Sequence, residues 1–272
     1  MPEMTDRLVQ HVQGLVPFVN TLADQARPAS LAHFRSPALN IETKDDLSPV
    51  TRADRETEAV LRDLISRRFP DHGIFGEETG QTEVDREFVW VLDPIDGTRA
   101  FVCGSPLWGT LIALAWRGWP VLGVIDAPAL GERWVGCVGL PTTRDGQVCR
   151  TRAVSSLDRA RLYTSTPDLF HGKDRERFDA LSAQVADRRF GGDCYSYGLL
   201  ASGWIDLVVD PEMQPYDYMA LVPVVEGAGG RVTDRQGRAL CLNSDGWVLA
   251  AGDAIGHAAA VAALGDVSEE NA

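Results

Sequence analysis

The residues best suited to chemistry stand in the hexapeptide Asp-Pro-Ile-Asp-Gly-Thr at positions 93–98, directly after the apolar run 88–92. Its proline rigidifies the turn, and its glycine permits a backbone conformation that other residues resist. The carboxylates of Asp93 and Asp96 can therefore face one point, joined by a backbone carbonyl between them. Such an oxygen-rich site suits Mg²⁺, which prefers hard ligands in octahedral geometry. The alternative is a turn that only ends a strand, with its side chains satisfying the backbone.

Two further acidic elements stand at element boundaries. Glu77 belongs to Gly-Glu-Glu at 76–78, after a short segment that ends another strand, and Asp217 follows Pro215 and Tyr216 just before a helix. Taken alone, Glu77 fits a solvated acidic turn and Asp217 fits a helix N-cap. Taken together with the hexapeptide, the three separated elements are what a multi-metal carboxylate site requires.

Rival chemistries lack their motifs. The five histidines are isolated, without the spacing of a zinc hydrolase, and no phosphate-binding loop of the nucleotide-kinase type is present. The Gly-rich cluster at 227–230 ends a predicted helix rather than opening one, which indicates a C-cap. The five cysteines are scattered and odd in number, which favours reduced thiols over a disulfide framework or a structural zinc site.

Composition narrows the class of protein further. The chain has 272 residues and a formal net charge of −13, from 39 acidic and 26 basic side chains. This sign argues against a general nucleic-acid binder, whereas bound cations would still allow hydrolysis of a phosphate ester. The sequence has no apolar stretch of membrane-spanning length, and its start lacks the order of a signal peptide. The expected compartment is the cytoplasm, with no membrane partner.

The first half must position the hexapeptide. Apolar residues at three- and four-residue steps from Leu8 to Ala26 predict a helix, and prolines predict a loop or short hairpin over 27–50. A second helix has its apolar face between Thr57 and Ile65 and closes before Phe69. The apolar runs 88–92, 107–116 and 121–125 read as buried strands.

The second half alternates helices and strands. The sequence predicts helices over 195–201 and 218–228, strands over 204–209 and 247–251, and a terminal helix capped by Asp253. Pro223 should kink its helix or mark the true start. These elements predict a mixed α/β (α+β) layered sandwich in two fused halves, 1–150 and 151–272, joined near 141–155.

The acidic elements, in this order and spacing, resemble the inositol monophosphatase superfamily of Mg²⁺-dependent, often lithium-sensitive phosphatases. The resemblance extends from about Asp54 to Gly230 and includes the Gly-Ala-Gly-Gly run at 227–230. Its D-P-x-D-G-T element is distinct from the D-x-D-G-T of haloacid-dehalogenase phosphatases, whose carboxylates stand two apart. The resemblance implies an αβαβα layered sandwich.

The resemblance also implies roles for individual residues. A first metal would be held by Glu77, Asp93 and the carbonyl of Ile95, and a second by Asp93, Asp96 and Asp217. Two or three Mg²⁺ ions per site are implied. The attacking water would be oriented by catalytic residues (Asp54, Glu77 and Thr98), and phosphate oxygens would meet the backbone of Gly97 and Thr98.

The implied reaction is one in-line displacement without a phosphoenzyme. Metals about 4 Å apart would lower the pKa of the water and stabilise the leaving alkoxide. Two departures concern the substrate rather than the metals. The family commonly has Trp-Asp where this chain has Tyr216 and Asp217, and Thr-Asn-Phe or Lys-Asn-Phe where this chain has Arg-Ala-Phe at 99–101.

Within the family, the segments 191–200 and 107–114 resemble the histidinol-phosphatase branch. Asp193 and Asp210 would then receive the amine and imidazole of histidinol phosphate by charge-assisted hydrogen bonds. The substrate side would also include Gly192 and Asp217. The same pair could bind hydroxyls of a sugar or inositol, and Asp193 could instead cap a helix. Histidinol phosphate is the first prediction and inositol 1-phosphate the second.

The expected partner is therefore a small phosphorylated metabolite, with no nucleic acid. Analogy with the family favours a homodimer. Some relatives also bind transcription machinery, so a regulatory binding protein of the same fold is a more distant alternative. The intact set of acidic residues argues for retained catalysis.

Overall fold

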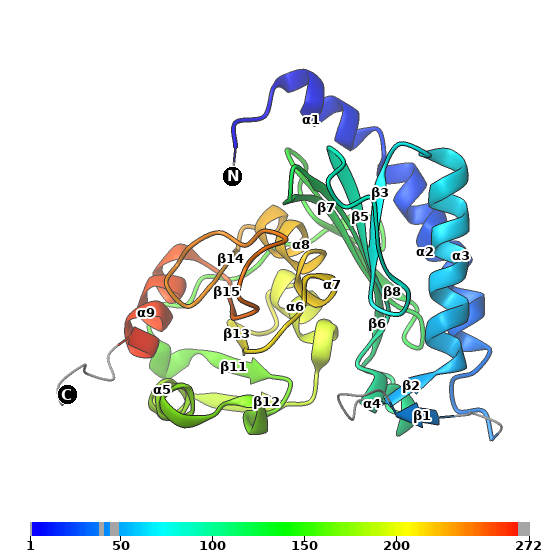
Figure 1. Ribbon diagram of the computed structural model, residues 1–272. Helices are drawn as coiled ribbons and strands as arrows, with labels where there is room; N and C mark the ends of the chain where they lie inside the picture. The colour runs from blue at the N-terminus through cyan, green and yellow to red at the C-terminus, as the bar shows by residue number, and fades with distance from the viewer. Residues whose placement is uncertain (1, 38–40, 44–48, 266–272) are drawn as a thin grey trace.

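The computed structural model describes residues 2–37, 41–43 and 49–265 of the chain. Five layers follow one another across these residues (Figure 1): two helices, a sheet, three helices, a second sheet and two helices. The outer helices on one side are α2 (Val16–Leu31) and α3 (Arg52–Arg68), and on the other α5 (Gly172–Ser182) and α9 (Ala254–Gly265). The central helices are α6 (Asp193–Ala201), α7 (Pro215–Tyr218) and α8 (Leu221–Gly227). The αβαβα sandwich expected from the sequence is confirmed.

The first sheet has the strand order β10-β9-β8-β7-β6-β5-β3-β4. Its members are β3 (Gly73–Gly76), β4 (Gly80–Thr82), β5 (Phe88–Asp96), β6 (Gly109–Trp116), β7 (Trp119–Ala127), β8 (Glu132–Cys137), β9 (Thr143–Arg144) and β10 (Gln147–Val148). Neighbouring strands are antiparallel except β3 and β5, which run parallel. The ends of β3 and β5 therefore meet at one edge of the sheet, where both carry acidic residues.

The second sheet has the order β12-β11-β13-β15-β14. Its strands are β11 (Arg161–Thr164), β12 (Asp187–Phe190), β13 (Leu207–Asp210), β14 (Arg231–Thr233) and β15 (Val248–Ala251). The chain passes from the first sheet to the second between Val148 and Arg161. A division into halves at residue 150 stays a prediction.

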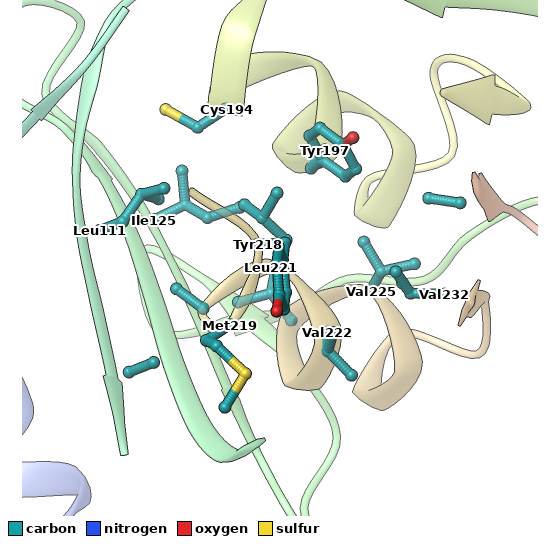
Figure 2. Close-up of a cluster of buried hydrophobic side chains, with 14 of the residues drawn as sticks. Leu111, Ile125, Cys194, Tyr197, Tyr218, Met219, Leu221, Val222, Val225 and Val232 are labelled. Carbon is teal, nitrogen blue, oxygen red and sulfur yellow. The ribbon is translucent and has the colours of Figure 1, made fainter. Parts of the chain in front are cut away.

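Side-chain alternation fills the space between the layers. On β5, Trp90 and Leu92 pack with α2 and α3, whereas Val89 and Val91 face the central helices. On β13, Val208 faces the central helices and its neighbours face α5 and α9. Figure 2 shows the central cluster, where Leu111 and other sheet residues meet side chains of α6, α7 and α8.

The first predicted helix is wrong in its continuity. The structure divides it into α1 (Asp6–Gln13) and α2. Pro17 lies in the first turn of α2, where its missing N–H costs no hydrogen bond, and this favours a new helix start over a continuous helix. The two helices then meet the sheet separately.

The loop predicted from residue 27 is wrong at its beginning, because α2 continues through Pro28 to Leu31. Arg27 holds this last turn by hydrogen bonds of 2.8 Å to each oxygen of buried Asp126. The hairpin alternative is confirmed by β1 (Ile41–Thr43) and β2 (Pro49–Thr51), which pair antiparallel. Residues 38–40 and 44–48 of that segment lie outside the described part of the chain.

The helix predicted over 218–228 is also divided, into α7 and α8. Pro223 stands third in α8, in the first turn, so it marks the true start rather than a kink. Gly229 follows with a φ of 103°, which fits the predicted glycine stop. Asp253 caps α9 as predicted, since its Oδ1 accepts the N–H of Gly256 at 2.6 Å.

Candidate active site

The hexapeptide continues β5 past its apolar run and is tied by its own backbone. The pairing of β5 with β6 shifts in register between Asp93 and Asp96, so the strand bulges where the aspartates stand. Asp93 Oδ1 accepts the N–H of Ile95 at 2.9 Å, and the Thr98 hydroxyl donates to the Ile95 carbonyl at 3.1 Å. Thr110 donates to the Pro94 carbonyl at 2.8 Å. These hydrogen bonds hold the turn in a single conformation.

Three carboxylates converge above this turn. Asp93, Asp96 and Asp217 each offer an oxygen, and these oxygens all lie within 4.8 Å of one another. Asp217 comes from α7, where its Oδ2 also accepts the N–H of Gln214 at 2.7 Å in a capping box. Asp217 is therefore not the N-cap that its place in the sequence indicated, because Gln214 holds that position. The Asp217 side chain completes the capping box from inside α7 and also joins the acidic cluster.

The cluster is electrostatically costly without a cation. Burial and the charge of Glu77 raise the pKa of Asp93 well above its ordinary value. Burial and the charge of Asp217 raise the pKa of Asp96 to about 7. A divalent cation among these oxygens would offset both burial and mutual repulsion. An all-oxygen donor set of this kind fits Mg²⁺.

Glu77 stands outside this trio but beside it. Its backbone N–H donates to the Leu92 carbonyl at 3.1 Å, which places it against the residue that precedes Asp93. The hydrogen bond and charge of Glu77 both raise the pKa of Asp93. Parallel pairing of β3 with β5 thus brings together two acidic elements that are well separated in the sequence.

Asp54 approaches the same edge from the first turn of α3. Its Oδ2 accepts the N–H of Thr51 at 2.8 Å and the Thr51 hydroxyl at 2.6 Å, in a capping box. Its Oδ1 is buried and has no hydrogen-bond partner. Burial raises the pKa of Asp54 and the charge of Glu77 adds to the rise, so the two carboxylates interact electrostatically. A buried oxygen of this kind is available to a water or a metal-bound group.

The start of α6 closes the site from the second half of the chain. The N–H of Cys194 donates to Asp96 Oδ2 at 2.6 Å. Gly97 has a φ of 82°, and a Cβ there would lie 2.7 Å from Asp193 Oδ2, so the Asp193 carboxylate rests against the metal-binding turn. Burial, with the charge of Asp96, raises the pKa of Asp193 to about 8. Gly192, the buried N-cap of α6, leaves no room for a side chain beside Ser196.

Asp210 differs from Asp193 in its surroundings. It is 2% exposed, and its oxygens accept hydrogen bonds from the Thr164 hydroxyl at 2.9 Å, the Ser165 N–H at 2.7 Å and the Tyr197 hydroxyl at 2.9 Å. These contacts occupy both oxygens. These hydrogen bonds favour a supporting role for Asp210, and a direct contact of Asp210 with substrate stays a prediction.

The fold and site geometry agree with comparisons with known proteins. The model of the inositol monophosphatase family matches residues 12–269. The chain belongs to the inositol monophosphatase family. It is 42% identical to a chloroplastic bifunctional phosphatase of Arabidopsis thaliana, over 90% of this chain and 73% of that protein. It is 38% identical to a histidinol-phosphatase of Chlorobaculum parvum, over 90% of this chain and 94% of that protein.

A solved structure gives the same answer. An inositol monophosphatase from Zymomonas mobilis superposes with a TM-score of 0.86 at 46% identity, covering 93% of this chain and 98% of that one. The relatives named above are phosphatases, and this chain is a phosphoric monoester hydrolase. Within its described residues, no helix combines the length and apolar character of a membrane-spanning segment.

Sequence reasoning missed two residues at the site. Ser165 bonds Asp210 through its N–H and lowers the pKa of Asp193 through its hydroxyl. No signal in the sequence marks it, because it follows β11, a strand that was not predicted. Glu58 is fully buried on α3. Its signal was a charged residue on the apolar face of a predicted helix, one turn after Asp54.

Proposed function

We propose that this chain is a Mg²⁺-dependent histidinol-phosphate phosphatase. The observation that carries the substrate assignment is the Asp193 carboxylate, half-buried and resting against the hexapeptide turn beside Asp96. A carboxylate beside the acidic trio suits a small phosphate ester whose other end carries a cation. The relative named histidinol-phosphatase, similar along almost its whole length, supports the same substrate.

The protein would hold Mg²⁺ through Glu77, Asp93, the Ile95 carbonyl, Asp96 and Asp217, with two or three ions. The bound ions would supply an activated water and stabilise charge on the leaving oxygen. Asp54 would use its unpartnered Oδ1 to orient that water, with help from Glu77 and Thr98. Backbone N–H groups at Gly97 and Thr98 would meet the phosphate, and Asp193 the cationic end.

Inositol 1-phosphate is the second candidate substrate. The similarity to the Zymomonas mobilis inositol monophosphatase supports it, and carboxylates also accept hydrogen bonds from hydroxyls. The scattered cysteines support a reducing compartment such as the cytoplasm. Family resemblance supports a homodimer.

Phosphate release from a panel of substrates tests the proposal. We expect histidinol phosphate to exceed inositol 1-phosphate, fructose bisphosphate and phosphoadenosine phosphate in kcat/KM, and all turnover to stop after chelation of divalent ions. Preference for inositol 1-phosphate would overturn the substrate, and undiminished turnover after chelation would overturn the metal requirement.

Substitution of the acidic trio tests the site itself. We expect Asp96→Asn and Asp217→Asn each to lower kcat by orders of magnitude, because each removes one charge from the donor set. Asparagine keeps the oxygen that caps α7 in Asp217→Asn, so helix capping alone would leave the rate nearly normal. Asp85→Asn, at an exposed position on the loop before β5, is the matched control.

A further inference from the structure

A fully buried carboxylate lies directly behind the turn that carries Glu77. Glu58 is 0% exposed on the inner face of α3, one helical turn after Asp54. Burial of a carboxylate is costly unless hydrogen bonds and an opposite charge compensate it. Its contacts therefore indicate what this group does.

Glu58 binds the backbone of the loop between β3 and β4. Its Oε2 accepts the N–H of Glu78 at 2.8 Å, and its Oε1 accepts the N–H of Thr79 at 3.1 Å. The Thr79 hydroxyl also donates to Oε1. The carboxylate thus receives three hydrogen bonds from the two residues that follow Glu77.

Arg62 completes this arrangement. Its Nε donates to Glu58 Oε1 at 2.7 Å, and its Nη2 donates to the carbonyl of Gly80. The arginine neutralises the buried carboxylate and holds the far end of the same loop. Both side chains lie on α3, so this helix forms hydrogen bonds with residues 78, 79 and 80 in succession.

Glu58 approaches Gly76, the residue before Glu77, so closely that a side chain there would displace the Glu58 carboxylate. A Cβ at Gly76 would lie 2.4 Å from Glu58 Oε1 and 2.7 Å from Oε2. Gly76 begins the Gly-Glu-Glu motif, and its backbone conformation is ordinary, so space alone explains the glycine. Together with the bond from the Glu77 N–H to Leu92, successive N–H groups of residues 77–79 are all fixed.

We propose that Glu58 is the positioning residue for Glu77. It fixes the backbone conformation next to Glu77, so that the Glu77 carboxylate is held near Asp93 in a single conformation. Its hydrogen bonds to the loop and its ion pair with Arg62 engage both of its oxygens, so it acts through the loop rather than as a ligand. This inference rests on the proposed metal role of Glu77.

Direct measurement of Mg²⁺ binding tests the proposal. We expect Glu58→Gln to weaken Mg²⁺ affinity, measured by titration calorimetry, about 10- to 100-fold, as loss of a partner behind a metal ligand does. The amide keeps the shape of the side chain but turns a donor toward the loop N–H groups. The Mg²⁺ concentration for half-maximal phosphate release should rise by a similar factor, with kcat largely recovered at saturating Mg²⁺.

The matched control is Glu56→Gln on the same helix, because Glu56 pairs with Arg52 and His33 away from the loop. Glu58→Gln that folds normally and binds Mg²⁺ like the wild type would overturn the positioning role. If Glu58→Gln does not fold, Thr79→Val decides, since it removes only the hydroxyl contact. It should weaken Mg²⁺ binding a few-fold, and unchanged binding would overturn the proposal. A wild type that binds no Mg²⁺ would instead overturn the proposed function.

Discussion

Asp193 stands in a conformation that few non-glycine residues adopt. Its φ is 41°, and it is the first residue of α6. Such strain persists only where the surroundings hold it. Here the next N–H is bonded to Asp96, while the side chain lies against Gly97 and meets Ser165. These contacts hold the backbone of Asp193 in its strained conformation and keep its carboxylate next to the acidic trio.

Substrate preference should depend on this carboxylate. We expect Asp193→Asn to reduce the preference for histidinol phosphate over inositol 1-phosphate by roughly tenfold or more, because a lost charge-assisted hydrogen bond costs about 1.5–3 kcal/mol. Asparagine tolerates positive φ as aspartate does, so the backbone should not change. The measurement is the ratio of kcat/KM for the two substrates at fixed Mg²⁺ and pH.

Asp85→Asn again serves as the control. If Asp193→Asn lowers kcat/KM equally for both substrates, Asp193 stabilises the hexapeptide turn and does not discriminate between the substrates.

The sequence was most informative where local geometry decides. The spacing of Asp93 and Asp96 on a proline turn predicted convergence, and the structure brings both together with Asp217. It was least informative where distant partners decide. Nothing near Asp210 in the sequence shows that Thr164, Ser165 and Tyr197 occupy its oxygens.

At the scale of elements, α8 packs on the first sheet without side chains between them at two places. A Cβ at Gly123 of β7 would lie 2.1 Å from the Ala220 carbonyl oxygen, and one at Gly136 of β8 would lie 2.2 Å from that of Pro223. Both contacts are with backbone, which cannot rotate away. Because these two adjacent strands carry glycine at the contacts, α8 packs directly on their backbone. This packing sets the position of α8, and with it that of α7 and Asp217.

Gly136→Ala should therefore destabilise the protein. We expect a loss of about 1–3 kcal/mol in the free energy of unfolding, because an added methyl group must displace a helix backbone. Denaturant titration measures it. Gly265→Ala is the matched control, since a Cβ at the end of α9 meets nothing within 4 Å. Equal stability of the two variants would show that α8 moves freely over the sheet.

A second element-scale contact joins α1 to the sheet through aromatic rings. His72 stacks on Phe69 at 4.7 Å and Phe88 at 5.1 Å between ring centroids, and its Nδ1 accepts the N–H of Trp90 at 3.1 Å. His11 of α1 lies over Phe88 at 5.5 Å. Burial lowers the pKa of His72 from 6.5, and His11 lowers it further.

The lowered pKa makes stability depend on pH. The unfolded chain takes up a proton at this residue near pH 6.5 while the folded chain does not, so the contribution of His72 to folding stability is full above that pH and decreases as pH falls below it. We expect the free energy of unfolding to drop more between about pH 7.5 and 5.5 in the wild type than in His72→Gln. His171→Gln, an exposed position, should behave like the wild type. Identical pH slopes in all three proteins would contradict the burial effect.

Elements were predictable from the sequence where apolar periodicity was strong. The strands β5, β6 and β7 and the helices α3 and α6 follow runs that the sequence shows plainly. By contrast, β8 begins with Glu132 and Arg133, whose charges conceal a strand that is buried by its neighbours. Arg133 is held by Asp126 on β7 at 2.6 Å, a contact that no local pattern reveals.

At the scale of the whole molecule, the acidic trio joins elements that are far apart in the sequence. Asp93 and Asp96 end a strand of the first sheet, and Asp217 stands on α7 in the central layer (Figure 1). Without a cation, repulsion between the ionised carboxylates would oppose the contact between these layers. A cation bound by all three carboxylates would instead hold the first sheet and α7 together.

This stabilising effect of a bound cation should be measurable as a rise in Tm. Groups with raised pKa contribute stability that is present at low pH and lost as pH rises through the folded value, about 7 for Asp96. The metal-free protein should therefore lose stability from this cluster between about pH 4 and 7, where the unfolded chain has released the Asp96 proton and the folded chain still holds it. Mg²⁺ should then raise Tm more at the higher pH, since fewer protons compete for the oxygens.

At about a hundredfold excess over its Kd, a ligand adds about 2.7 kcal/mol, which amounts to several degrees in Tm for a chain of this size. Asp217→Asn should lose most of this rise while its metal-free Tm stays equal to or above that of the wild type, because one repelling charge is gone. The same comparison with Asp85→Asn should leave the rise intact. Differential scanning calorimetry with and without Mg²⁺ at both pH values provides the measurement. A Mg²⁺ response that is unchanged in Asp217→Asn would mean that the cation binds elsewhere, and that α7 is held against the sheet by packing alone.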